Sequence, residues 1–136
     1  MTTTPAPDPA RALPKTPTLF VDGATFPAVR MTVLEGHGSV GHVELKPLMV
    51  GDDMLLVEIF EKAGVSVPAH SHDDHESIVY LIRGRMQLTI GDQTFVAKAG
   101  DAWRHPIGVM HTSVTLEDCV AIEIKSPPRK TWNTQA

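Results

Sequence analysis

Short runs of apolar and β-branched residues follow one another along most of the chain, separated by Gly, Asp and Pro. From residue 18 onward this punctuation is typical of an all-β protein with many short strands. No stretch of about 12 residues keeps a helical period without Gly or Pro. We therefore expect strands near residues 18–21, 28–33, 39–45, 54–60, 77–82, 85–90, 93–97, 102–104, 111–115 and 120–125.

The dipeptide Gly91-Asp92 separates two of these runs, residues 86–90 and 93–96. Two residues of this type between β-prone runs are a good hairpin signal, because Gly tolerates the positive φ of a tight turn. Many strands at close spacing predict a sandwich, a jelly roll or a barrel.

Proline divides the chain of 136 residues into three segments. Residues 1–17 hold five of the eleven prolines and little apolar material, so we expect a flexible N-terminal arm. Residues 18–126 are expected to form a single barrel, which fits the size of one domain. Pro127 and Pro128 end the last expected strand, so residues 127–136 are expected to form an irregular C-terminal tail.

Composition limits the classes of protein that fit. Aromatic residues make up only 5% of the chain, so the core must rest on aliphatic side chains and Met. The formal net charge of -4 argues against a general attraction to nucleic acid or anionic membranes. The chain lacks an apolar run of about 18 residues and a signal-peptide core, so we expect a cytoplasmic protein. Cys119 is the single cysteine and is expected to be a small buried apolar residue.

Residues 70–76 contain three histidines, two aspartates and one glutamate. His70 and His72 are two residues apart, so both imidazoles would point to the same face of a strand. Together with a nearby carboxylate they would form part of a ligand shell for a divalent metal. His111 is the candidate for a distant ligand, because residues 106–108 would turn the chain just before it.

These residues resemble the two motifs of the cupin superfamily, in its small single-domain form. The residues that resemble the first motif are Gly64, His70-Ser71-His72, Glu76 and Gly84. Those that resemble the second are Gly100, Pro106-Ile107-Gly108 and His111, with the family's spacing of five residues before Pro106 and two before His111. The family often has Asn four residues after this histidine, where the chain has Thr115.

The resemblance implies a double-stranded β-helix, a jelly-roll barrel of two antiparallel sheets with one divalent metal (Fe, Mn, Ni, Co or Zn) near one end. The metal ligands it implies are His70, His72, Glu76 and His111. Counted forward from His72, the position of the family's glutamate falls on Glu76. Counted back from Gly84, it falls on Ser77, and a shift of one residue turns a side chain to the other face. His75 in place of Glu76, or a site of three histidines alone, are the alternatives, as is a barrel without metal.

Such a metal would keep about two open positions, which suit a bidentate oxygen substrate such as a β-diketone, an α-keto acid or an enediol. We expect a metal-dependent enzyme acting on a small oxygenated metabolite, either a lyase or isomerase using a Lewis acid or a dioxygenase using Fe(II). A non-catalytic small-molecule-binding or sensor cupin is the alternative. A homodimer is expected, because small cupins commonly pair their sheets.

Other polar residues fit the barrel less directly. Glu58 and Glu123 stand alone on apolar strands; either would be a general base if it pointed inward, but we expect an outward face for both. His105 is expected in an exposed loop rather than at a pocket mouth. Arg83 would grip a substrate carboxylate if it pointed inward.

Overall fold

The computed structural model describes residues 8–38 and 41–134. One short 3-10 helix, η1 (Pro9–Arg11), precedes a series of strands. The strands are β1 (Val29–Arg30), β2 (Val33–Leu34), β3 (His37–Gly38), β4 (Val43–Val50), β5 (Leu55–Glu61), β6 (Ser66–His70), β7 (Glu76–Arg83), β8 (Arg85–Ile90), β9 (Gln93–Lys98), β10 (Ala102–His105), β11 (His111–Thr115) and β12 (Cys119–Ser126).

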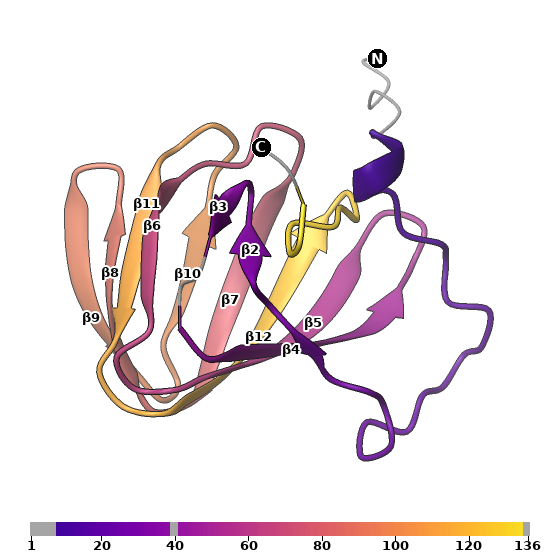
Figure 1. Ribbon diagram of the computed structural model, residues 1–136, viewed down its shortest axis with the longest axis horizontal. Coiled ribbons are helices and arrows are strands. Elements are labelled where there is room, and N and C mark those ends of the chain that lie inside the picture. The colour runs from indigo at the N-terminus through magenta and orange to yellow at the C-terminus, as the bar shows by residue number, and fades with distance from the viewer. Residues whose placement is uncertain (1–7, 39–40, 135–136) are drawn as a thin grey trace.

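Two antiparallel sheets form the walls of the molecule (Figure 1). The larger sheet has the order β1-β4-β5-β12-β7-β10, and the smaller has the order β6-β11-β8-β9. Strands β2 and β3 form a separate small hairpin, and Leu34 of β2 lines the cavity between the two sheets. The expected all-β jelly-roll architecture is therefore confirmed.

Strand β8 shows how the residue pattern places side chains on the two faces of a sheet. Met86 and Leu88 are buried, while Arg85 and Gln87, which alternate with them, are exposed, as the two-residue period of a strand requires. The predicted hairpin follows directly, because Ile90 pairs with Gln93 and Gly91 has a φ of 59°.

The turn between β7 and β8 requires glycine. Gly84 has a φ of 97°, and a Cβ atom at this position would lie 2.3 Å from the carbonyl oxygen of Asp118. Any other residue would clash with the backbone there and adopt a strained conformation. The turn thereby holds the start of β12 close against the β7–β8 connection.

The core consists of two clusters of buried, mainly aliphatic residues, as expected. The first comprises Met31, Val43, Leu45, Val50, Leu55, Val57, Val65, Val67 and Trp132. The second comprises Val79, Leu81, Met86, Leu88, Ala97, Cys119 and Ala121. Cys119 is 1% exposed, so its interpretation as a buried apolar residue is confirmed.

Some expected strands differ from the structure. Residues 18–21 form no strand, and both Leu19 and Phe20 expose their side chains, so this run has neither a partner strand nor a buried face. The expected strand 28–33 is divided between the short strands β1 and β2. Of the expected strand 39–45, residues 39–40 lie outside the described residues, Gly41 and His42 form a bend, and β4 begins at Val43. Strand β6 was not among the expected strands.

The segments before and after the barrel meet each other. The backbone N–H of Lys130 donates to the carbonyl of Arg11 at 2.8 Å, and Trp132 pairs with Leu34 through an isolated bridge. Residues 1–7 of the expected arm and 135–136 of the expected tail lie outside the described residues. Among the residues that are described, no helix is long and apolar enough to cross a membrane. The segment boundaries, the homodimer and the cytoplasmic location stay predictions.

Candidate metal centre

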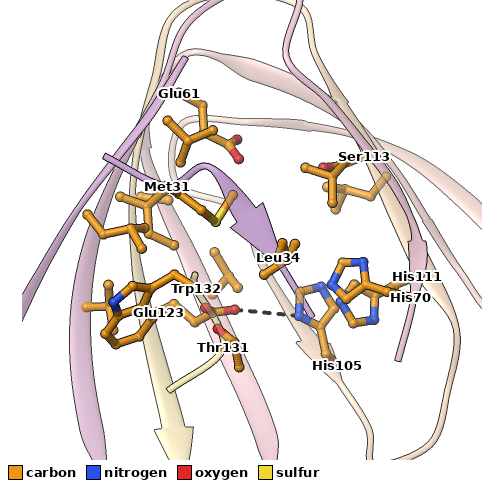
Figure 2. Close-up of a pocket in the computed structure, with 18 of the residues that line it drawn as sticks. Met31, Leu34, Glu61, His70, His105, His111, Ser113, Glu123, Thr131 and Trp132 are labelled. Atoms are coloured by element: carbon orange, nitrogen blue, oxygen red, sulfur yellow. Dashed lines mark ion pairs between the residues drawn. The ribbon is translucent and has the colours of Figure 1, made fainter. Parts of the chain in front are cut away.

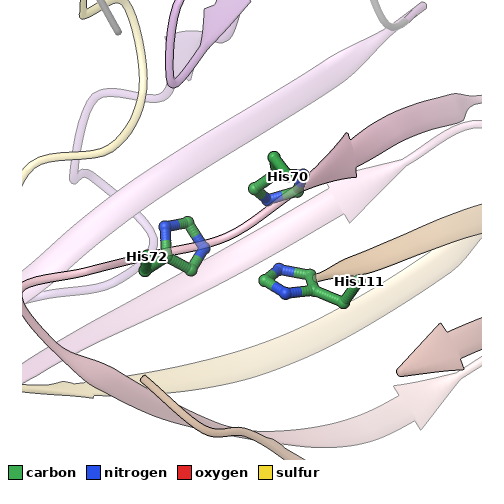
Figure 3. A group of neighbouring side chains, drawn as sticks. All are labelled: His70, His72 and His111. Carbon is green, nitrogen blue, oxygen red and sulfur yellow. The ribbon is translucent and has the colours of Figure 1, made fainter. Parts of the chain in front are cut away.

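The structure brings His70, His72 and His111 together (Figure 3), and all three line the cavity. His70 ends β6 and His111 begins β11, and the two residues are direct partners in the antiparallel ladder. His72 follows β6 by two residues, and its carbonyl accepts a hydrogen bond of 2.9 Å from the N–H of Gly108. The turn that was expected to precede His111 therefore also holds the backbone of His72.

The three imidazoles converge on a common point. One ring nitrogen from each lies within 4.8 Å of the others, and the ring centroids are 4.2 to 5.0 Å apart. The three residues are buried, with exposed fractions of 5%, 5% and 7%. Three buried nitrogen donors that face one another are a suitable partial shell for one divalent ion.

Each histidine is oriented through its Nδ1 atom. Nδ1 of His70 lies 2.8 Å from the carbonyl oxygen of Pro68, and Nδ1 of His111 lies 3.3 Å from that of Val109. A carbonyl oxygen can only accept, so both Nδ1 atoms carry the proton and both Nε2 atoms keep a lone pair. Outer partners of this kind fix the tautomer and orientation of histidines that bind metals.

The Nδ1 atom of His72 has a carboxylate partner, the Oε1 atom of Glu35 at 3.2 Å. Burial alone would raise the pKa of Glu35, but hydrogen bonds from His72 and Arg11 and the charge of Arg11 outweigh it and hold this pKa at about 2. The ionised carboxylate can only accept, so Nδ1 of His72 is the donor and Nε2 is the ring nitrogen turned away from Glu35.

His70 and His111 are in the protonation state that metal binding requires. Burial lowers the pKa of His70 to about 4 and that of His111 to about 3, because a positive imidazolium is poorly solvated there and the neighbouring histidines add to the effect. Both rings are neutral at pH 7, the form that binds a cation. The donor set and the partners of its three Nδ1 atoms therefore fit one divalent metal held by three Nε2 atoms.

The expected fourth ligand, Glu76, is not part of this group. Glu76 is exposed at the start of β7, where it pairs with Ser126 of the neighbouring strand. His75 is fully buried, and its ring centroid lies 4.5 Å from that of His72, but it too is outside the group of converging donors. Whether Glu76, His75 or neither completes the shell stays a prediction.

A second set of polar side chains runs from the triad to the opposite side of the cavity. Figure 2 shows His105 beside His70 and His111, and Glu123 across the cavity from them. His105 of β10 stacks on His111, with ring centroids 3.8 Å apart and an interplanar angle of 7°. Its Nδ1 atom lies 3.0 Å from Ser77 Oγ and 3.7 Å from Glu123 Oε2. Glu123 and Lys125 of β12 are paired at 3.5 Å, and Lys125 also donates to the hydroxyl of Thr131.

Glu123 carries its negative charge in this buried position. Burial alone would raise its pKa, but the charge of Lys125 and the hydrogen bond and charge of His105 lower the pKa well below its ordinary value. The cavity therefore has a wall of imidazole donors and an opposite wall with an ionised carboxylate.

Two expectations about this second wall were wrong. Glu123 was expected to point outward, yet it lines the cavity, while Ile124 beside it is 42% exposed. His105 was expected in an exposed loop, yet it lies on β10, is half-buried and lines the cavity. Arg83 is exposed at the end of β7 and does not line the cavity, and neither does Glu58.

The comparisons with known proteins agree with this fold. Residues 56–124 match the Cupin_2 cupin domain model, so the chain belongs to this family. The chain is 33% identical over 89 residues to the pectin degradation protein KdgF of Dickeya dadantii (strain 3937), an alignment that covers 64% of this chain and 80% of the relative.

Two solved structures are also similar to this chain. KdgF from Halomonas sp. is similar with a TM-score of 0.60 and 27% identity, over 62% of this chain and 80% of that one. An RmlC-like cupin from Shewanella frigidimarina NCIMB 400 is similar with a TM-score of 0.65 and 21% identity, over 87% of this chain and 94% of that one. The second likeness shows the fold alone.

Proposed function

We propose that this cupin is a metal-dependent lyase or isomerase that acts on a small oxygenated metabolite of the sugar-acid class. The observation that carries the proposal is the pairing of two walls in one cavity, the histidine triad on one and the ionised Glu123 on the other. The similarity to KdgF, a pectin degradation protein, supports the substrate class, because pectin is a polymer of sugar acids.

A divalent ion held by His70, His72 and His111 would act as a Lewis acid, stabilising negative charge that develops on a substrate oxygen. The remaining work falls to side chains of the chain itself. Glu123 is ionised and faces the cavity, so it would accept a proton from a substrate carbon next to a carbonyl group. The electron pair of the broken C–H bond would move toward the carbonyl oxygen, and the proton would return to a neighbouring atom.

The surroundings of Glu123 keep it ionised and connect it to the triad. Lys125 keeps the carboxylate charged, and His105 lies between the carboxylate and the triad, where it would hold or pass on the proton. Met31, Leu34 and Trp132 contribute apolar surface to the same cavity and would exclude water from the reacting atoms.

The test uses protein loaded in turn with Fe, Mn, Ni, Co or Zn and incubated in deuterated water with a panel of small sugar acids and keto acids. Proton NMR would detect isomerisation, elimination or exchange of a carbon-bound proton, which the proposal predicts for at least one metal–substrate pair. Oxygen consumption with the iron-loaded protein would indicate a dioxygenase instead. Ligand binding without exchange, turnover or oxygen consumption would indicate a non-catalytic binding protein.

A further inference from the structure

Arg11 lies outside the barrel strands, in the short helix η1, yet its side chain reaches two carboxylates near the histidines. Its Nη1 and Nη2 atoms each donate a 2.8 Å hydrogen bond to Glu35. Its Nε and Nη2 atoms donate to Asp74 at 3.0 and 3.1 Å. One planar guanidinium thus binds both carboxylates in the bidentate manner that fixes their positions.

Each of these carboxylates continues to a buried histidine. Glu35 Oε1 lies 3.2 Å from Nδ1 of His72, and Asp74 Oδ1 lies 2.8 Å from Nδ1 of His75. The rings of His72 and His75 are in contact, with centroids 4.5 Å apart. Arg11 is therefore connected to His72 along two paths, one through Glu35 and one through Asp74 and the neighbouring ring.

In both paths the carboxylate is the acceptor and the histidine is the donor. Asp74 and Glu35 each accept two hydrogen bonds from the guanidinium of Arg11, a group that is always charged and can only donate. Ionised carboxylates can only accept, so each Nδ1 atom donates its proton and the Nε2 atom faces away from the carboxylate. For His72 this is the nitrogen that the metal would bind.

The backbone around Arg11 is anchored to the rest of the fold. The carbonyl of Arg11 accepts from the N–H of Lys130, and the N–H of Thr16 donates to the carbonyl of Val50. Arg129 approaches Asp74 at 3.5 Å from the C-terminal side. The chain segments on both sides of the barrel therefore converge behind His72.

We propose that Arg11 is a positioning residue of the metal centre, whose guanidinium clamps Glu35 and Asp74 so that His72 presents Nε2 to the ion. The proposal rests on the metal site proposed above. It makes the segment before the barrel part of the site, although Arg11 would touch neither metal nor substrate. Removing a partner of this outer kind lowers metal affinity by about 10- to 100-fold in other metal sites.

The test is metal affinity, measured by competition with a chromogenic chelator on the full chain. Arg11→Gln should weaken binding by about 10- to 100-fold. Arg11→Lys should restore little, because one ammonium group cannot reproduce bidentate contacts to two carboxylates. The double variant Arg11→Gln/Glu35→Gln should bind less weakly than the product of the two single effects predicts, since both substitutions interrupt the same path.

A matched control comes from the same segment. Lys15 pairs with Asp52 at 2.8 Å, but both side chains are well exposed and neither contacts a histidine. Lys15→Ala should leave the affinity within about twofold, because exposed ion pairs contribute little. The visible absorption spectrum of the Co²⁺-loaded protein gives a readout that a purely structural role would not move. It should change in Arg11→Gln and remain unaltered in Lys15→Ala.

The variant His72→Ala separates this proposal from the one it rests on. Loss of metal in His72→Ala, with wild-type affinity and an unchanged cobalt spectrum in both Arg11 variants, would overturn the role of Arg11 and leave the metal site standing. Full metal retention in His72→Ala would overturn the metal site itself. The expected result is loss in His72→Ala and a partial, spectrally visible loss in the Arg11 variants.

Discussion

The two walls of the cavity are built in different ways. The triad wall takes its histidines from β6, β11 and the link after β6, and each Nδ1 atom is held by a backbone carbonyl or a carboxylate outside the cavity. The wall with Glu123 and His105 consists of side chains that hold one another. The first wall is suited to binding a cation with fixed geometry, and the second to holding a charge and a proton. We therefore expect substitutions to separate metal binding from chemistry.

The largest expected effect is on the triad wall. His111→Ala removes one of three converging donors, so bound metal should fall from near one ion per chain to almost none. The loss should exceed the roughly 10- to 100-fold expected for an outer partner. Elemental analysis after gel filtration measures it. His42→Ala is the control, because His42 pairs with Glu44 away from the triad. Normal metal content in His111→Ala would contradict the triad assignment.

A substitution in the opposite wall should slow the chemistry and leave metal binding intact. Glu123→Gln keeps the size of the side chain and removes its charge, so metal content should stay at the wild-type level. The rate of proton exchange on a substrate should fall by about 10²- to 10⁴-fold, the usual contribution of a general base. Proton NMR in deuterated water measures the rate. Equal loss of metal and activity would show that the two walls do not act separately.

A third substitution tests how the second wall holds its charge. Lys125→Met leaves the buried carboxylate of Glu123 without its cation, which should lower the free energy of unfolding by about 3–5 kcal/mol. Urea denaturation of the metal-free protein measures it. Adding Glu123→Gln to Lys125→Met should recover most of the loss, because no unpaired charge remains. A double variant as unstable as the single one would point to packing of Lys125 instead.

The smallest expected effect concerns Glu61, which lines the cavity and bonds to Thr115. Burial, aided by the charge of Glu123, raises the pKa of Glu61 to about 7. The folded state then holds this proton more tightly than the unfolded state. The contribution of the proton to the free energy of unfolding is therefore complete below pH ~4.5 and lost as pH rises through about 7. The free energy of unfolding of Glu61→Gln should therefore rise relative to that of the wild type by on the order of 2 kcal/mol between pH 5 and pH 8. Urea unfolding at both pH values measures this, and an equal difference at both would contradict it.

Much of the fold and the triad could be predicted from local pattern. Strands β8 and β11 have the bounds that the sequence predicts, because each lies between clear turn residues. The triad follows from two short motifs whose ligands need only the correct register. Strand β6 was missed because Pro68 interrupts its pattern, although its carbonyl later proves to hold His70.

The second wall could not be predicted because β12 points charged side chains inward and an apolar side chain outward. Ile124 is exposed, while Glu123 and Lys125 face the interior. Strand β7 likewise exposes Ile78 and Tyr80, so apolar residues occur on both faces of these central strands. A residue pattern cannot indicate which face is inside when both are partly apolar. The contact from Arg11 to Asp74 spans 63 residues, and no local signal predicts it.

The most direct test of the central claim is a crystal structure of the metal-loaded protein with anomalous diffraction data collected at the absorption edge of the metal. The account predicts one anomalous peak about 2.0–2.2 Å from the Nε2 atoms of His70, His72 and His111, with all three Nδ1 atoms still bonded to their oxygen partners. A peak elsewhere, coordination through Nδ1, or no peak between these rings in fully loaded protein would contradict it.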